Sequence, residues 1–182
     1  MNLTWTDLNK NNSSLFDIKD FTALCAMSKS DETEIIHYLR SSIAPIETAG
    51  SSLAATYNIL KSFHQHYNQK GCKYLLLKDN RSQDIMIGIG ISTFAGLPFE
   101  EKVGEFRDFI NPSKLSESEV SKFILTSEDQ AILMGYRKLY INITKNQSSL
   151  KEIYLQLGYL NVEDQSSKFG ETKSSKLLFK SL

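Results

Sequence analysis

At the centre of the chain, two apolar runs at residues 72–78 and 84–93 flank the five polar residues 79–83. Apolar runs of this length around a polar tip predict an antiparallel β-hairpin. A third run, residues 103–110, alternates between apolar and polar residues and ends before Pro112, because proline lacks the N–H donor that would continue a ladder. The centre of the chain is therefore predicted to form three consecutive strands.

Segments with helical periodicity lie on both sides of these strands. Before them, Ile35, Leu39 and Ile43 recur every four residues, and a second apolar stripe reaches His64 and Tyr67. Further helices are predicted over residues 116–134 and 149–157, and further strands over residues 20–27, 138–144, 159–162 and 176–182. Together these segments predict an α/β (α+β) fold with the order β-α-α-β-β-β-α-β-α-β-β.

The length and charge of the chain limit what it can be. A chain of 182 residues corresponds to one domain, which we place at residues 19–182 after a polar N-terminal extension over residues 1–18. Basic and acidic residues balance at 21 each, so no net charge attracts nucleic acid or an anionic membrane. No segment has the roughly 20 apolar residues that span a bilayer, and the first residues do not resemble a secretory signal. We therefore expect a cytoplasmic protein, a monomer or a homodimer, without nucleic-acid or membrane partners.

Three short stretches, in the order and spacing in which they occur, resemble parts of a known superfamily. Residues 23–31 (ALCAMSKSD) are similar to its opening strand, which ends in Thr or Ser and Asp, and residues 105–112 (EFRDFINP) to its fourth strand. Residues 153–159 (IYLQLGY) match its ending Tyr-x-x-x-Gly-Phe, with tyrosine in place of the phenylalanine. With the order of elements, these stretches make the chain resemble the GCN5-related N-acetyltransferases (GNAT). The resemblance implies a mixed, twisted sheet flanked by helices, which splits in a V between the strand ending at Ile110 and the strand 138–144.

The same resemblance implies an activity. GNAT enzymes transfer an acyl group from acyl-CoA, most simply acetyl-CoA, to a primary amine by direct attack in a ternary complex, so the implied acceptor is a small-molecule or peptide amine. Tyr154 occupies the position of the tyrosine that protonates the departing CoA thiolate, a role that a phenol suits. Glu105, or an ordered water, would take the proton from the amine. Backbone groups of Phe109 and Ile110 would hold the pantetheine arm.

One part of the GNAT pattern is altered in this chain. After the fourth strand the family usually carries Arg/Gln-x-x-Gly-x-Gly/Ala, whose glycines let backbone N–H groups approach the CoA pyrophosphate at a helix N-terminus. The predicted contacts of the pyrophosphate here are Leu115, Ser116, Glu117, Ser118, Glu119 and Val120. Of these, Val120 brings a branched side chain where the backbone should be bare, and Glu117 and Glu119 would repel an anion.

This altered loop leaves other interpretations open. A GNAT-fold binding or regulatory protein that is catalytically weak or inactive would also be expected to have such a loop. So would a transferase that uses another acyl donor in the same groove. On the alternative interpretation of Tyr154, this residue simply packs on the inner stripe of its helix beside Leu150 and Leu157.

Other polar residues and glycines are expected to have structural roles. Glu105 and Asp108 are three apart on a strand, so we expect them to point to opposite faces and form no pair. His64 and His66 lie about 200° apart around a helix and cannot chelate one ion, so no metal site is predicted. The Gly88-x-Gly90 pair lies within a strand and indicates a bulge or close packing, not a nucleotide-binding loop.

Overall fold

The computed structural model describes residues 21–43, 63–79, 81–94, 97–144, 147–162 and 175–182. The predicted extension over residues 1–18, most of the second predicted helix and most of the loop before the last strand lie outside these residues. Within them, helices and strands follow one another in the predicted order. No helix in these ranges is long and apolar enough to cross a membrane.

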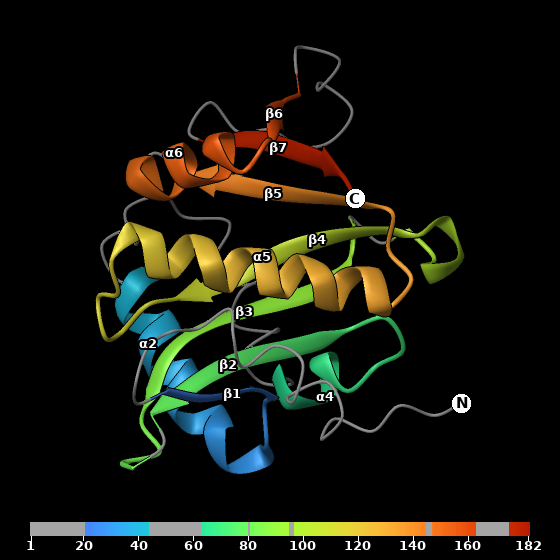
Figure 1. The fold of residues 1–182 in the computed structure, drawn as a ribbon. Helices are drawn as coiled ribbons and strands as arrows, with labels where there is room; N and C mark the ends of the chain where they lie inside the picture. The colour runs from blue at the N-terminus through green and yellow to red at the C-terminus, as the bar shows by residue number, and fades with distance from the viewer. Residues whose placement is uncertain (1–20, 44–62, 80, 95–96, 145–146, 163–174) are drawn as a thin grey trace.

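The centre of the fold is a seven-stranded sheet in the order β1-β2-β3-β4-β5-β7-β6 (Figure 1). The strands are β1 (Phe21–Ala26), β2 (Lys73–Asp79), β3 (Ile85–Thr93), β4 (Val103–Ile110), β5 (Lys138–Thr144), β6 (Leu160–Asn161) and β7 (Ser175–Ser181). Neighbouring strands are antiparallel, except that β4 and β5 are parallel. A parallel pair needs a crossover connection, and helix α5 (Glu117–Leu133) supplies it. The sheet is therefore mixed, as predicted.

The parallel pair is short. Residues 103–106 of β4 pair with residues 138–141 of β5, and the described residues beyond these positions do not pair with each other. Each strand continues in a ladder on its other side, β4 with β3 as far as Ile110 and β5 with β7 as far as Thr144. The carboxyl-terminal halves of β4 and β5 therefore separate, which confirms the predicted V-shaped split.

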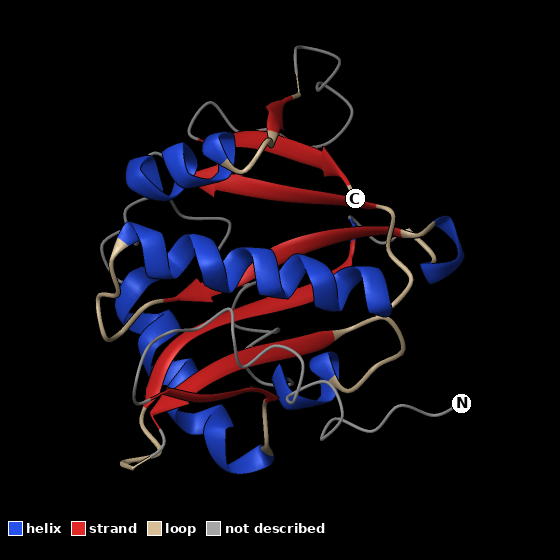
Figure 2. Cartoon of the chain, in the orientation of Figure 1, coloured by secondary structure: helices blue, strands red, loops and turns tan. Residues whose placement is uncertain are grey.

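Helices cover both faces of the sheet. α2 (Glu32–Ile43) and α4 (Phe63–Tyr67) pack on one face, and α5 and α6 (Ser148–Gln156) pack on the other (Figure 2). Two short 3-10 turns, η1 (Lys29–Asp31) and η4 (Phe99–Glu101), precede α2 and β4. We call the two sides the α2/α4 face and the α5/α6 face.

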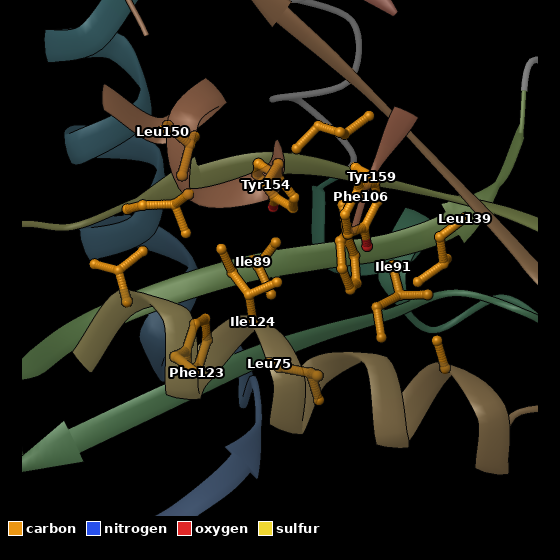
Figure 3. Packing of buried hydrophobic residues seen from close by; sticks show 14 of the residues in the cluster. Leu75, Ile89, Ile91, Phe106, Phe123, Ile124, Leu139, Leu150, Tyr154 and Tyr159 are labelled. Carbon is orange, nitrogen blue, oxygen red and sulfur yellow. The ribbon is translucent and has the colours of Figure 1, made fainter. Parts of the chain in front are cut away.

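Each face has its own buried apolar cluster. The larger cluster, on the α5/α6 face, contains side chains of β2, β3, β4 and β5 under the two helices (Figure 3). The smaller cluster joins Ile35 and Leu39 of α2 to Tyr74 and Leu76 of β2 on the α2/α4 face. β2 and β3 are thus buried on both sides, so the centre of the sheet is a rigid base for the end of β4.

Candidate functional site

The end of β4 contains a β-bulge. Between Arg107 and Ile110, β4 has one residue more than the facing part of β3. Asp108 within this stretch has φ +52°, in the left-handed region that residues other than glycine rarely adopt. The Tyr74 hydroxyl donates to the Asp108 carbonyl oxygen at 2.7 Å and so satisfies a backbone group that the bulge removes from the ladder. The bulge changes the direction in which the last side chains of β4 point.

Two glycines of β3 make room for the tyrosines that hold the bulge. A Cβ atom on Gly88 would lie 2.8 Å from the Tyr74 ring, and a Cβ atom on Gly90 would lie 2.0 Å from the Tyr67 hydroxyl. Tyr67 in turn donates a hydrogen bond to the carboxylate of Asp108. The interpretation of the two glycines as sites of close packing is therefore confirmed.

The bulge also brings two acids to the same side of β4. Arg107 donates from Nη1 to Glu105 at 3.0 Å and from Nε to Asp108 at 3.1 Å. The expectation that Glu105 and Asp108 point to opposite faces is therefore wrong, because the bulge interrupts the alternation of side chains along the strand. Since Asp108 also binds Tyr67 of α4, this polar cluster lies on the α2/α4 face.

Glu105 has the surroundings of a proton acceptor. Its side chain is largely buried, and it accepts a hydrogen bond from Ser92 Oγ at 3.1 Å in addition to the one from Arg107. Burial raises the pKa of Glu105, and the charge of Arg107 and the hydrogen bonds from Ser92 and Arg107 offset only part of this effect. A fixed carboxylate with a raised pKa is suited to general base catalysis near neutral pH.

Tyr154 lies on the α5/α6 face. It is fully buried on α6, with its ring centroid 6.4 Å from that of Phe106 and 4.8 Å from that of Tyr159 (Figure 3). Its hydroxyl is buried and has no hydrogen-bond partner among the residues that the structure describes. Burial, and then the negative charge of Glu128, raise the pKa of Tyr154 well above its ordinary value, so the phenol keeps its proton.

A buried charged pair lies beside this tyrosine. Glu128, in the middle of α5, is 5% exposed and accepts a hydrogen bond from Lys180 of β7 at 2.6 Å through Oε2. Among the described residues, its other carboxylate oxygen and the hydroxyl of Tyr154 are buried without a hydrogen-bond partner. Sequence reasoning did not identify this pair. The available signal was the position of Glu128, four residues after Ile124 on the apolar stripe of the helix.

Glu105 and Tyr154 lie on opposite sides of the point where the sheet splits. Glu105 pairs with Tyr140 and Phe106 with Ile141, and these are the last pairs before β4 and β5 separate. Phe106 contacts the Tyr154 side of the sheet, and adjacent residues of a strand project to opposite faces. The predicted acid and the predicted base are therefore separated by the sheet but close to the same opening in it.

A pocket of about 150 Å³ lies at the open end of the split. It is lined by Phe109 and Asn111 after the bulge, by Leu115, Glu117 and Val120 at the start of α5, and by Ser149, Leu150 and Ile153 of α6. Four of the predicted donor-binding residues, Phe109, Leu115, Glu117 and Val120, are thus brought together here. The Ile110 side chain instead packs in the α2/α4 cluster, so only its backbone is available to this side. The lining combines apolar side chains with the polar side chains of Asn111, Glu117 and Ser149, and its apolar part suits an uncharged chain such as a pantetheine arm.

The start of α5 is closed by its own side chains. Ser116 is the N-cap, and its N–H donates to Glu119 Oε2 at 2.8 Å while the Glu119 N–H donates to Ser116 Oγ at 3.4 Å. These reciprocal bonds form a capping box. The Val120 N–H donates to the Ser116 carbonyl oxygen and begins the helical ladder. The N–H groups of Glu117 and Ser118, in the first turn, have no acceptor within the helix. The residues therefore fit the arm of CoA better than its diphosphate.

The histidines of α4 are arranged differently from the prediction. The buried residues of α4 are Phe63 and Tyr67, so Phe63, and not His64, continues the apolar stripe. His64 is half-exposed and hydrogen-bonds to Asn68. Burial lowers the pKa of His66, as does the charge of Arg107. In the part of the chain that the structure describes, no group of three or more His, Cys, Asp or Glu side chains could hold a metal ion.

No protein-family model and no curated protein sequence matches the chain, whereas solved structures do. An acetyltransferase of the GNAT family from Staphylococcus aureus Mu50 is 15% identical, with 88% of this chain and 98% of that chain covered and a TM-score of 0.63. The protein yncA from Salmonella typhimurium, determined with acetyl-CoA, is 15% identical over 90% and 94% of the two chains, with a TM-score of 0.66. Mutant forms of the spermidine/spermine N-acetyltransferase SpeG from Vibrio cholerae are 10% identical over 87% and 93%, with a TM-score of 0.61. The chain has the GNAT fold.

Two of the stretches that resemble GNAT sequences meet at this site. Residues 105–112 form the bulged end of β4, and residues 153–159 form the end of α6 and the turn after it. They are in contact through the rings of Phe106 and Tyr154. The GNAT fold thus brings together the parts of the chain that carried the resemblance.

Proposed function

We propose that this protein is an N-acyltransferase that moves an acyl group from a pantetheine thioester, most simply acetyl-CoA, to a primary amine. The observation that carries the proposal is the split between β4 and β5, with Glu105 on one side, Tyr154 on the other and a pocket at its open end. A thioester entering by the pocket and an amine entering from the α2/α4 face would meet at the split.

The chemistry assigns one proton transfer to each face of the sheet. The amine nitrogen forms a bond to the acyl carbon, and the carbon–sulfur bond breaks. Glu105 takes the proton that the amine loses, and Tyr154 gives its phenolic proton to the departing thiolate. The products are an amide and a free thiol. Glu105 then releases its proton to solvent and Tyr154 takes one up, so the number of protons is unchanged.

Two of the similar structures support the substrate classes. The Salmonella protein is determined with acetyl-CoA, which supports a thioester donor, and SpeG acts on spermidine and spermine, which supports a small amine acceptor. In this protein the backbone of Phe109 and Ile110 would hold the donor arm at the mouth of the pocket. We place the protein in the cytoplasm, where such donors occur.

A second candidate function is favoured by the closed start of α5. Because Glu119 occupies the helix N-terminus at which GNAT enzymes are expected to bind the CoA pyrophosphate, the fold also suits a binding or regulatory protein without transferase activity. The two functions differ in whether a thioester is consumed.

The test is thiol release from acetyl-CoA and from S-acetylpantetheine, measured with a set of polyamines, amino acids and a lysine peptide. The transfer rate should fall as the pH falls through the raised pKa of Glu105, because the carboxylate must be ionised to accept a proton. Glu105→Gln should lose this pH dependence and about 10²-fold in rate. Glu101→Gln removes an exposed charge nearby and should change neither. No binding and no consumption of either thioester would refute the transferase and leave the binding protein.

A further inference from the structure

The start of α5 differs from an anion-binding helix N-terminus in its hydrogen bonding. A helix binds a phosphate through the N–H groups of its first turn, which have no partner within the helix. Here Glu119 Oε2 accepts hydrogen bonds from both the backbone N–H and the hydroxyl of Ser116, at 2.8 and 2.6 Å. The Glu119 N–H is itself bonded to Ser116 Oγ. The carboxylate of Glu119 is therefore fixed beside the first turn, next to the N–H groups that an anionic ligand would use.

The charges at this helix start oppose a diphosphate as well. The hydrogen bonds from Ser116 lower the pKa of Glu119, so Glu119 is ionised at neutral pH. Glu117 adds a second acid in the same turn and lines the pocket. The N–H groups of Glu117 and Ser118, which have no acceptor within the helix, thus lie between carboxylates.

The neighbouring pocket favours an uncharged ligand. Its apolar walls include the side chains of Phe109, Leu115, Leu150 and Ile153, and the one charged residue of its described lining is the acid Glu117. The polar side chain of Asn111 is already bonded to the loop, since it accepts from the Leu115 N–H at 2.9 Å. The site would therefore bind the arm of the donor mainly by apolar contact.

We propose that the site recognises its acyl donor by the pantetheine arm alone and that the diphosphate of CoA adds no affinity. This inference rests on the proposed function, since it concerns the donor of the same transfer. It makes the donor a pantetheine thioester of any kind, whether free, phosphorylated or extended to CoA.

Calorimetry with four probes tests the inference: pantetheine, 4′-phosphopantetheine, CoA and adenosine 3′,5′-bisphosphate. We expect the first three to bind within about threefold of one another and the bisphosphate not to bind. CoA affinity more than tenfold above that of pantetheine would overturn the inference and leave the transferase intact. Failure of all four to bind would instead overturn the proposed function on which the inference rests.

Two variants identify the cause. Glu119→Gln keeps a capping box, because glutamine serves at this position, but removes the charge. It should tighten CoA about two- to fivefold at low salt, leave pantetheine unchanged and keep the thermal stability of the helix. Asp129→Asn removes an exposed charge near the other end of α5 and should change neither affinity. Unchanged CoA binding in Glu119→Gln would refute the role of the capping box.

Discussion

Replacing Tyr154 by phenylalanine should make the protein more stable and less active. The substitution keeps the ring and its contacts with Phe106 and Tyr159, and it removes a buried hydroxyl that has no partner in the described part of the chain. A buried unsatisfied polar group costs about 1–3 kcal/mol, so we expect the free energy of unfolding to rise by about 1–2 kcal/mol. In a domain of this size that raises the melting temperature by about 2–8 °C.

The activity of the same variant should change in the opposite direction. If Tyr154 protonates the departing thiolate, its loss removes a general acid, which is typically worth about 10²–10⁴ in rate. Urea denaturation and thiol release therefore give results of opposite sign for one substitution. A residue that only filled the core would not lower turnover when its ring is kept.

Two other tyrosines serve as matched controls. Tyr159 has its hydroxyl beside Glu128 and no role in the proposed transfer, so Tyr159→Phe should keep full turnover. The Tyr136 hydroxyl donates to the Gly71 carbonyl oxygen, so Tyr136→Phe should lose about 1 kcal/mol. A loss of 1 kcal/mol or more in Tyr154→Phe would refute the reasoning, because the hydroxyl would then have a partner in the folded protein. Full turnover would remove Tyr154 from the mechanism.

Two further predictions concern stability. Gly90→Ala places a Cβ 2.0 Å from the Tyr67 hydroxyl and should lower the free energy of unfolding, measured in urea, by about 3–5 kcal/mol. Gly158→Ala has a positive φ but open space around the new Cβ, so it should cost about 1–2 kcal/mol. Equal costs would contradict the packing argument. Burial raises the pKa of Asp31, but its hydrogen bonds and its ion pair with Lys78 outweigh this and lower it overall. The pair therefore stabilises the fold above a pH of about 4, and the deficit of Lys78→Met in acid titrations should be largest near neutral pH and shrink as the pH falls below that value.

The strands could be predicted from the sequence because their signals are local. The runs at residues 103–110 and 138–144 have the bounds of β4 and β5, since each ends at a clear break in the apolar pattern. Helix starts were less certain. α5 has its N-cap at Ser116, where the predicted helix begins, but α6 begins at Ser148 after Gln147, one residue before the predicted start.

The arrangement of the site could not be predicted in full because it depends on contacts between distant residues. The shared position of Glu105 and Asp108 follows from the bulge, which Tyr67 and Tyr74 of other elements hold in place. The Glu128–Lys180 pair joins residues 52 positions apart, and no local pattern relates a helical acid to a base on the last strand. Periodicity places a residue on a face, but only the packed fold selects its partner.

The short ladder between β4 and β5 has a consequence for how the molecule opens. Four residue pairs join these strands, whereas seven join β5 to β7, so the two portions of the sheet are held together by a short ladder, the seam between them. α5 lies along the β3–β4 side of that seam, and α6 along the β5–β7 side (Figure 1). In amide hydrogen exchange, the portion from β1 to β4 and the portion from β5 to β7 should behave as two cooperative units. Amides at residues 138–141 that bond across the seam should exchange before those that bond to β7.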